Sequence, residues 1–244
     1  MHIGRNDVNM QYNMKDEDDG LHPLQVTREE KDLGIWMEST MKFTAHIAHA
    51  VNKANQILGL IRRSFTYLDT ALTKQLYTSM VRPHLEYGNV VWHPYLKKDV
   101  DLLERVQRRA TKLVPVLSKL SYEDRLKEMD LPSLVYRRIR GDSIDIYKYL
   151  RGMYRTNVES LLPLAKSTSG VATRGHSLKL EKRHCRTQLR ANTLGYRMVN
   201  FWNSLPEEVV AAKSVNAFKG HFDKHCSAIR YCLDVDEIQS LMSS

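Results

Sequence analysis

The strongest constraint on the fold lies in residues 74–113, where apolar, aromatic and basic residues are most densely patterned. The apolar residues at its end recur at steps of three, four and three, which places them on one face of a helix. They are Leu103, Val106, Ala110 and Leu113. Cations with the same period lie on the opposite face: Arg105, Arg108, Arg109 and Lys112. Such a helix packs its apolar stripe on a core and turns its cationic stripe to an acidic partner or to solvent.

Two other segments show the helical period. Residues 41–65 carry apolar residues at steps of four and three: Ile47, Val51, Ala54, Leu58, Ile61 and Phe65. Residues 132–154 carry a similar stripe: Val135, Ile139, Ile146, Leu150 and Met153. Asp69 or Thr70, and Ser121, have the short polar side chains that cap helix N-termini. These patterns predict a mainly α-helical body over residues 41–162, with His46 and His49 on its surface.

The ends of the chain predict smaller elements. Residues 1–40 are typical of strands and loops, with a polar turn at 15–20 and a short apolar strand at 32–37 that contains Gly34. Residues 163–176 have a linker composition. Residues 177–226 indicate a small β/α element, with a strand at 178–180 that returns at 182–190, and residues 227–244 a fraying tail. The predicted fold class is therefore mainly α, a helical bundle with a small β element at the N-terminus and a small β/α element near the C-terminus.

The middle of the 74–113 segment is punctuated by Pro83, Gly88 and Pro94. Proline removes an amide donor and crowds the preceding turn, so we expect the helix to kink or restart near Arg82. Tyr87 and Trp92 add large side chains with one polar group each.

Three stretches of this region, in order, carry a family resemblance: 77–87 (YTSMVRPHLEY), 91–92 (VW) and 103–112 (LERVQRRATK). Together they resemble the thumb, and the segment after it, of non-LTR (LINE-type, jockey-like or CR1-like) retrotransposon reverse transcriptases. Residues 136–142, 173–177 and 199–206 extend the similarity. The resemblance implies that residues 1–40 correspond to the end of the palm, with the primer-grip hairpin at Leu33 and Gly34.

The resemblance also implies that the catalytic palm, with its paired aspartates, lies upstream of the region that this chain matches. Asp18 and Asp19 are not that pair, because their neighbours are polar and nothing orients them for metal binding. We therefore expect no catalytic residue and no polymerase activity in this fragment. It needs no cofactor, whereas the full-length family enzyme uses Mg²⁺. The missing fingers and palm are expected partners.

Positive charge is concentrated in two blocks of the chain, whose formal net charge is +9. Residues 41–115 hold 12 basic and 5 acidic residues, and residues 174–190 hold 6 and 1. A polyanion is the natural partner of such blocks, and the arginine fork suits phosphate. With the family resemblance, the expected role is contact with the phosphates of an RNA/DNA duplex without sequence specificity. The candidate residues are Leu33, Gly34, Lys97, Lys98, Arg105, Arg108, Arg109, Lys112, Arg137, Arg138, Arg174, Lys182, Arg183 and Arg186.

The remaining sequence features mostly argue against a secreted protein, a membrane protein and a metal site. Three separated cysteines argue for a reducing, intracellular compartment, nuclear or cytoplasmic, and a signal peptide or membrane span is not indicated. His221, His225, Cys226 and Cys232 do not have the spacing of a zinc site, so we expect no metal. Two alternatives stay open: a host protein that has adopted this nucleic-acid-binding module, and a helical scaffold whose basic faces bind acidic proteins.

Overall fold

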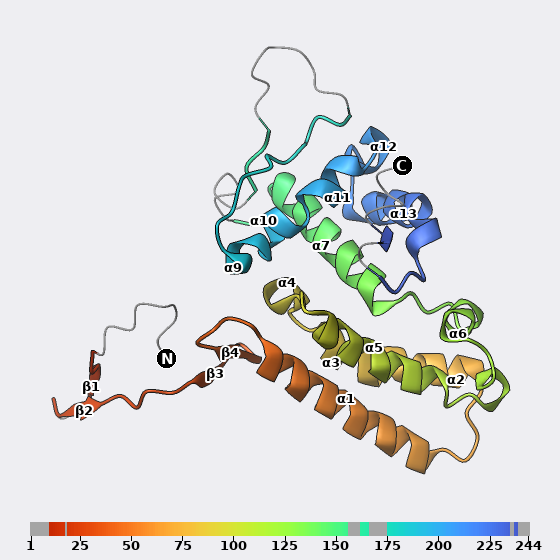
Figure 1. Ribbon diagram of the computed structural model, residues 1–244, viewed down its shortest axis with the longest axis horizontal. Helices are drawn as coiled ribbons and strands as arrows, with labels where there is room; N and C mark the ends of the chain where they lie inside the picture. Colours follow the sequence, from red (N-terminus) through yellow and green to blue (C-terminus); the bar gives the residue numbers. More distant parts are fainter. Residues whose placement is uncertain (1–9, 18, 156–161, 166–174, 235–236, 239–244) are drawn as a thin grey trace.

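Helices dominate the structure, a computed structural model that describes residues 10–17, 19–155, 162–165, 175–234 and 237–238. The predicted mainly α fold is confirmed, and the strands form two small antiparallel sheets near the N-terminus. The helices form a lower and an upper unit in Figure 1, and each has its own cluster of buried apolar residues.

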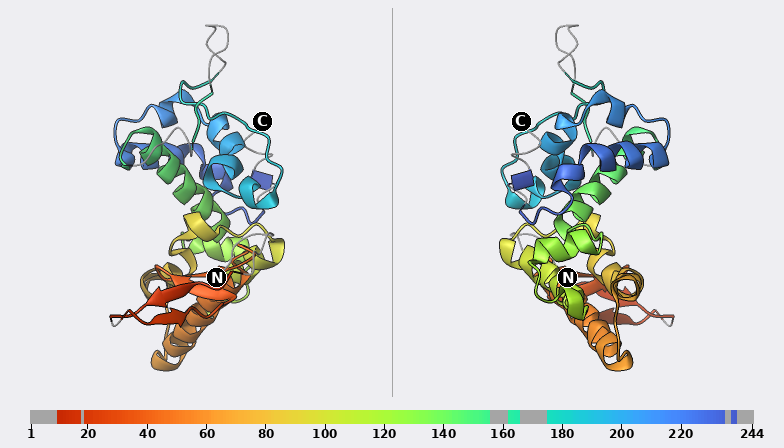
Figure 2. Two further views of the ribbon diagram at one scale, coloured as in Figure 1. Left: turned by 90° about the vertical axis from the view of Figure 1, so that its left-hand side faces the viewer. Right: turned by 90° about the vertical axis from the view of Figure 1, so that its right-hand side faces the viewer.

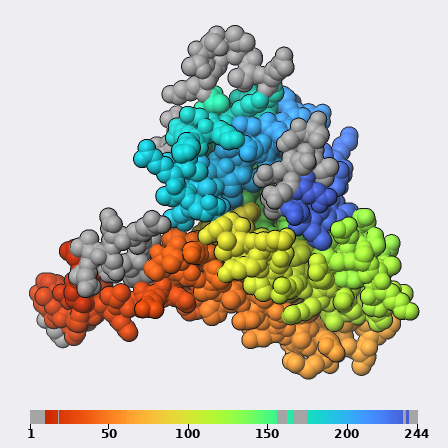
Figure 3. Space-filling model, in the orientation of Figure 1, coloured from red at the N-terminus to blue at the C-terminus, as the bar shows by residue number. Residues whose placement is uncertain are grey.

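The N-terminal strands are two hairpins. Strand β1 (Asn13–Lys15) pairs with β2 (Leu21–Pro23), and β3 (Glu29–Asp32) pairs with β4 (Ile35–Glu38). The first hairpin is exposed throughout and projects beyond the helices, as the space-filling view in Figure 3 shows. Gly34 lies in the turn between β3 and β4, not inside a strand as predicted, because Leu33 and Gly34 both adopt positive φ angles.

The lower unit contains a long first helix and several shorter elements that return along it. In chain order they are α1 (Thr44–Ser64), α2 (Thr70–Leu76), a π-helical turn (Tyr77–Val81), α3 (Arg82–Glu86), α4 (Asn89–Trp92), α5 (Lys97–Thr111), a 3-10 turn (Pro115–Leu117) and α6 (Tyr122–Glu128). Asp69 and Ser121 cap α2 and α6 as predicted, each accepting a hydrogen bond from the amide three residues on.

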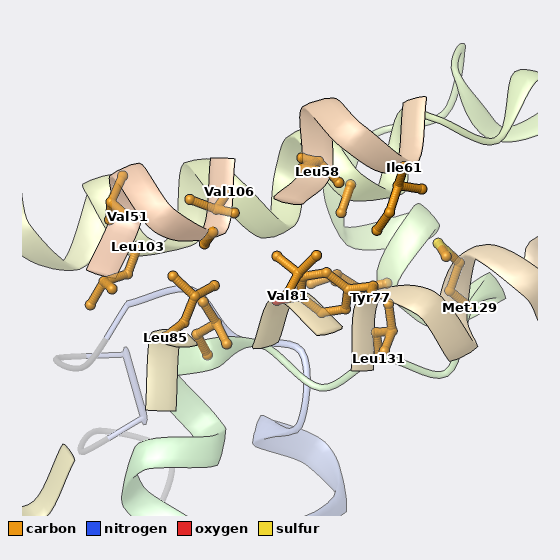
Figure 4. Close-up of a cluster of buried hydrophobic side chains, with 14 of the residues drawn as sticks. Val51, Leu58, Ile61, Tyr77, Val81, Leu85, Leu103, Val106, Met129 and Leu131 are labelled. Atoms are coloured by element: carbon orange, nitrogen blue, oxygen red, sulfur yellow. The ribbon is translucent and has the colours of Figure 1, made fainter. Parts of the chain in front are cut away.

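Helices α1 and α5 lie side by side and run parallel. The Thr44 hydroxyl donates to Asp99 at one end, and Arg109 donates to Asn55 further along. From the segment that includes the π-helical turn and α3, Tyr77, Val81 and Leu85 point toward the apolar side chains of both helices, as Figure 4 shows. The predicted stripes of α1 and α5 are therefore the buried faces, although Phe65 and Leu113 lie at the margin.

The predicted restart near Arg82 takes the form of the π-helical turn. The Arg82 amide bonds to the carbonyl of Tyr77, five residues back, instead of four. Pro83 has no amide hydrogen with which to continue the normal ladder, so the wider turn accommodates its ring without ending the helix.

The upper unit is built on α7 (Leu134–Leu150). Short helices follow it: α9 (Gln188–Ala191), α10 (Leu194–Arg197), α11 (Val199–Ser204), α12 (Glu207–Val210), α13 (Val215–His225) and a 3-10 turn (Ser227–Ile229). Figure 2 shows these helices gathered around α7. The two apolar clusters divide at the start of α7, between Leu134 and Val135, rather than in the 163–176 segment.

Residues 177–190 differ from the predicted pair of strands. Among the described residues only Leu180 forms a β-bridge, with Leu164. The amide side chain of Asn203 bonds to both the N–H and the carbonyl of Leu180, and the Trp202 indole donates to the carbonyl of Leu178. Side chains of α11 and two backbone bonds with residues 163–165 together satisfy this segment, so residues 182–190 do not return as its partner strand.

The predicted fraying tail is also wrong for the residues that are described. Ile229 and Ile238 are buried in the upper cluster. The Ser133 hydroxyl donates to the carbonyl of Cys232, and its amide donates to the carbonyl of Arg230, so this segment passes the junction of the two units.

A buried arginine links the units. Arg197 of α10 makes two hydrogen bonds of 2.9 Å to Asp142 of α7 within the upper unit, and it also donates to the carbonyl of Val90 in α4 of the lower unit. Burial alone would raise the pKa of Asp142, but its interactions with His93 and Arg197 outweigh burial and lower that pKa. His93 Nδ1 lies 3.2 Å from Asp142, and burial lowers the pKa of the His93 ring.

We expect Arg197→Met to lower the free energy of unfolding by about 3–5 kcal/mol, because it leaves the Asp142 carboxylate buried without its main partner. Chemical denaturation measures this loss. The double variant Arg197→Met with Asp142→Asn removes the unpaired charge and should recover part of the loss. Equal stability of the single and double variants would show that the two side chains are not coupled.

Candidate nucleic-acid interface

Helix α5 has three faces rather than the two that the sequence predicts. Leu103, Val106 and Ala110 form the buried apolar stripe, as predicted. All four predicted cations of its last turns are exposed: Arg105, Arg108, Arg109 and Lys112. We call these four residues the basic ridge.

The third face is a buried polar stripe that the sequence reasoning missed. Its members follow the helical period: Glu104, Gln107 and Thr111. Glu104 accepts from the Tyr122 hydroxyl at 2.6 Å, and burial raises the pKa of its carboxyl group. Gln107 accepts from the Tyr77 hydroxyl and donates to the carbonyl of Pro132, while Thr111 accepts from Arg125. These bonds fix the rotation of α5 and therefore the direction in which the ridge faces.

The two sides of the ridge differ in their surroundings. Arg105 and Arg108 border a small hollow that Asp101 and Glu104 also line, and the Arg108 guanidinium stacks on the Tyr122 ring at 4.7 Å. Acidic neighbours reduce the attraction of this side for an anion.

The other side opens into a larger hollow of about 630 Å³ between the C-terminal ends of α1 and α5. Three cations line it, Arg62, Arg109 and Lys112, and none of the described residues that line it is acidic. Tyr67, which is 70% exposed, and Thr66 close the end of the hollow at the loop that leaves α1. We call this hollow the α1–α5 groove. It offers positive charge, hydroxyl donors and an aromatic ring together.

Gly59 explains part of the depth of the groove. It lies in the last turns of α1, and a Cβ added there would meet only a side-chain nitrogen of Arg63 at 3.9 Å. Because Gly59 has no side chain, it leaves open space in the groove, which Leu58 and Arg109 also line. Four residues of the groove were not predicted as site residues: Asn55, Gly59, Arg62 and Tyr67. The sequence of α1 does indicate a basic surface, because it ends in two arginines and contains no acidic residue.

The predicted cations at the start of α5 are exposed as well. Lys97 and Lys98 occupy its first turn, at the opposite end of the helix from the groove. This is also the end at which the parallel helix α1 begins. Neither lysine forms an ion pair with another residue in the described part of the chain.

Of the predicted arginines of α7, one is partly exposed but paired and the other is buried. Arg137 makes a double ion pair with Glu86, and neighbouring Arg140 makes one with Asp223. Arg138 is only 3% exposed, so its side chain does not reach the surface, where the predicted phosphate contact would form. Burial lowers the pKa of its guanidinium. Arg137 and Arg140 are thus engaged in ion pairs within the fold, and Arg138 is buried.

The basic block near the C-terminus is separate from the groove. Lys182, Arg183 and Arg186 are exposed in an irregular segment, and Arg183 pairs with Glu181. Figure 1 places the adjoining helix α9 at the end of the molecule near β4 and α4, whereas α5 runs toward α2 and α6. Arg174 lies outside the described residues.

The predicted contact at Leu33 and Gly34 is a tight turn at a hairpin tip. The Tyr87 hydroxyl donates to the carbonyl of Leu33 at 2.9 Å, and the Leu33 side chain is 84% exposed. A Cβ at Gly34 would come within 3.1 Å of the Tyr87 ring, which explains why the position is glycine. The tip and the groove lie at opposite ends of α1.

The remaining expectations concern a histidine, a metal site and a membrane span. His46 is buried rather than on the surface as predicted, since it accepts from the Trp36 amide and packs near Trp92. No three described His, Cys, Asp or Glu side chains lie close enough together to hold a metal ion. No described helix has the length and apolarity that a membrane span requires.

Comparison with known proteins finds a similar chain in Caenorhabditis elegans, "Uncharacterized protein B0403.1". The two are 30% identical over 139 residues, which cover 54% of this chain and 68% of the C. elegans protein. No protein-family model matches this chain. No solved structure matches it either.

We expect Leu33→Asn to stabilise the protein by about 1 kcal/mol, seen as a rise of about 2–4 °C in the unfolding midpoint. Leucine is strained at a φ of 45°, whereas Asn followed by Gly suits a turn with two positive φ angles. Thermal unfolding followed by circular dichroism measures the change. Gly34→Ala is the control and should destabilise. A midpoint for Leu33→Asn at or below that of the unmodified protein would contradict this description of the turn.

Proposed function

The chain belongs to the same family as the C. elegans protein B0403.1, and we propose that it binds the phosphate backbone of nucleic acid in the α1–α5 groove. The observation that carries the proposal is the composition of this groove: Arg62, Arg109 and Lys112 line it, and the described lining has no acidic residue. Phosphate contact by exposed arginine and lysine side chains gives binding that depends on salt and does not depend on sequence.

The groove favours nucleic acid over a small anion. Its cations are spread over two helices, and Asn55 and Thr66 add polar groups of the kind that bond to phosphate and sugar oxygens. The Arg109 guanidinium is positioned by its hydrogen bond of 2.9 Å to Asn55. Tyr67 presents an exposed ring at the end of the groove, where an unpaired base can stack.

The sequence resemblance supplies a more specific proposal. In this proposal the lower unit is the thumb of a LINE-type reverse transcriptase, and it grips the RNA/DNA primer–template duplex. The β3–β4 turn at Leu33 and Gly34 then corresponds to the primer grip. The fragment retains duplex binding but not catalysis, since Mg²⁺ and the paired aspartates belong to the palm of the full-length enzyme.

We expect neutralisation of the groove to weaken duplex binding and its dependence on salt. Each phosphate contact contributes about −0.9 to the slope of log K against log salt concentration. The triple variant Arg62→Gln, Arg109→Gln, Lys112→Gln should therefore have a slope that is shallower by about 2.7. Fluorescence anisotropy with two duplexes of unrelated sequence measures it, and both should lose affinity equally.

A matched control removes the same charge elsewhere. The triple variant Lys213→Gln, Lys219→Gln, Lys224→Gln lies in and beside α13 of the upper unit. It should keep most of the salt slope. If both triple variants lose the same amount of salt slope, the duplex is attracted by the net charge of the protein, and the groove is not the site. Equal binding of heparin and duplex by the unmodified protein would favour the acidic-protein scaffold instead.

Gly59 allows a second test that leaves every cation in place. Gly59→Glu and Gly59→Gln should both strengthen α1, since either residue has a better helix propensity than glycine by about 0.5–1 kcal/mol. Only the glutamate adds a negative charge to the groove. Duplex affinity should fall for Gly59→Glu relative to Gly59→Gln at low salt, and the difference should shrink as salt screens it.

We expect the purified chain not to extend a primer. The proposal assigns catalysis to a palm that this chain does not match, and Asp19 lies in an exposed turn where it pairs with Lys15. Incubation with a primed RNA template, dNTPs and Mg²⁺ or Mn²⁺ is the assay. Template-dependent products that persist through purification would overturn the assignment of this chain to a region outside the palm, without bearing on duplex binding by the groove.

A further inference from the structure

A second cavity lies at the junction of the two units, away from the groove. It has a volume of about 320 Å³ and is enclosed by the start of α5, the first half of α7, α10, α11 and residues 233–234. This volume is at the lower end of the range of small-molecule sites. Its lining combines an apolar wall with a few polar groups.

The Arg138 guanidinium is the unusual group in this lining. The residue is 3% exposed, and its buried Nη2 has no hydrogen-bond partner among the described residues. The nearby carboxylates are already bonded elsewhere: Glu104 accepts from Tyr122 and from the Leu134 amide, and Asp142 accepts two bonds from Arg197. A buried cationic donor without an acceptor is costly, so an acceptor is expected in the cavity.

Asn192 gives an independent sign of the same missing acceptor. Its Nδ2 is also buried without a hydrogen-bond partner, and the residue lines the same cavity. Its backbone carbonyl accepts from Arg197, which holds the residue at the end of α9. Two unused donors, one of them charged, match the two oxygens of a carboxylate.

The rest of the lining indicates what the carboxylate is attached to. Apolar side chains form most of the wall: Pro94, Val100, Val135, Ile139, Met198, Phe201 and Leu233. Asp101 and Asp234 also line the cavity, and their charges oppose a ligand with several negative charges such as a nucleoside triphosphate. The lining therefore suits a single negative charge on an apolar body.

We infer that this cavity binds a monocarboxylate with an apolar body, with Arg138 and Asn192 holding the carboxylate and the wall of α7, α10 and α11 holding the body. Such a ligand contacts both units and stabilises their junction. The site is distinct from the α1–α5 groove, and its occupancy does not depend on the proposed function.

Octanoate is the probe, and octanol and acetate are its controls. Isothermal titration calorimetry with the full chain should show binding of octanoate, with much weaker binding of octanol, which lacks the charge, and of acetate, which lacks the body. Octanoate should also raise the midpoint of thermal unfolding. Equal binding of octanoate and octanol would overturn the role of Arg138, and no binding of octanoate at millimolar concentration would show a cavity that holds water only.

The variants test the two donors. Arg138→Met keeps the length of the side chain and removes the donors, so the affinity for octanoate should fall by about tenfold or more. Its unfolding midpoint without ligand should be unchanged or higher, because a buried charge without a partner has been removed. Asn192→Ala should weaken octanoate binding less, since its donor is neutral. Lys213→Gln, outside the cavity, is the control. Unchanged octanoate affinity in a folded Arg138→Met protein would overturn the proposal.

Discussion

The arrangement of the two units depends on one buried polar cluster, in which Asp142 and Arg197 of the upper unit pair and Arg197 bonds onward to the lower unit. Asp142 is fully buried, and Arg197 reaches both its carboxylate and the carbonyl of Val90 in the lower unit. A carboxylate in this position is stable only while its donors stay in place, because a buried charge that loses its partner destabilises a fold strongly. The apolar clusters on either side of α7 are non-directional, so it is this pair, with Glu104 bonding to the Leu134 amide, that sets the orientation of α7 between them.

The elements that the sequence predicted well are those whose signal is local. The apolar residues of α1 and α5 repeat with the period of a helix, and Asp69 and Ser121 each cap a helix with their own side chain. The 177–190 segment has an equally clear local pattern that did not produce strands. Its hydrogen bonds are made by Trp202 and Asn203 of α11 and by the backbone of residues 163–165, and nothing in its own composition indicates those partners.

The same distinction separates the cations of α5 from those of α7. Both helices carry closely spaced arginines, and from the sequence they are equivalent candidates for phosphate. Arg137 and Arg140 pair with Glu86 and Asp223, which are 51 and 83 residues away. Arg105 and Arg109 have no acidic partner in the described part of the chain, although Arg109 bonds to Asn55. Only the tertiary arrangement distinguishes an arginine that closes the core from one that remains available.

The parallel course of α1 and α5 has a consequence for the arginines at their ends. Each helix carries a partial negative charge at its C-terminus, and here the two C-termini come together at the groove. Arginines in the last turns, Arg62 and Arg63 on α1 and Arg108 and Arg109 on α5, offset this repulsion whether or not a ligand is bound. The positive charge of the groove therefore serves folding as well as the proposed binding. A descendant of this chain that had lost its ligand would still gain from keeping these arginines, whereas Gly59 and Tyr67 would be free to change.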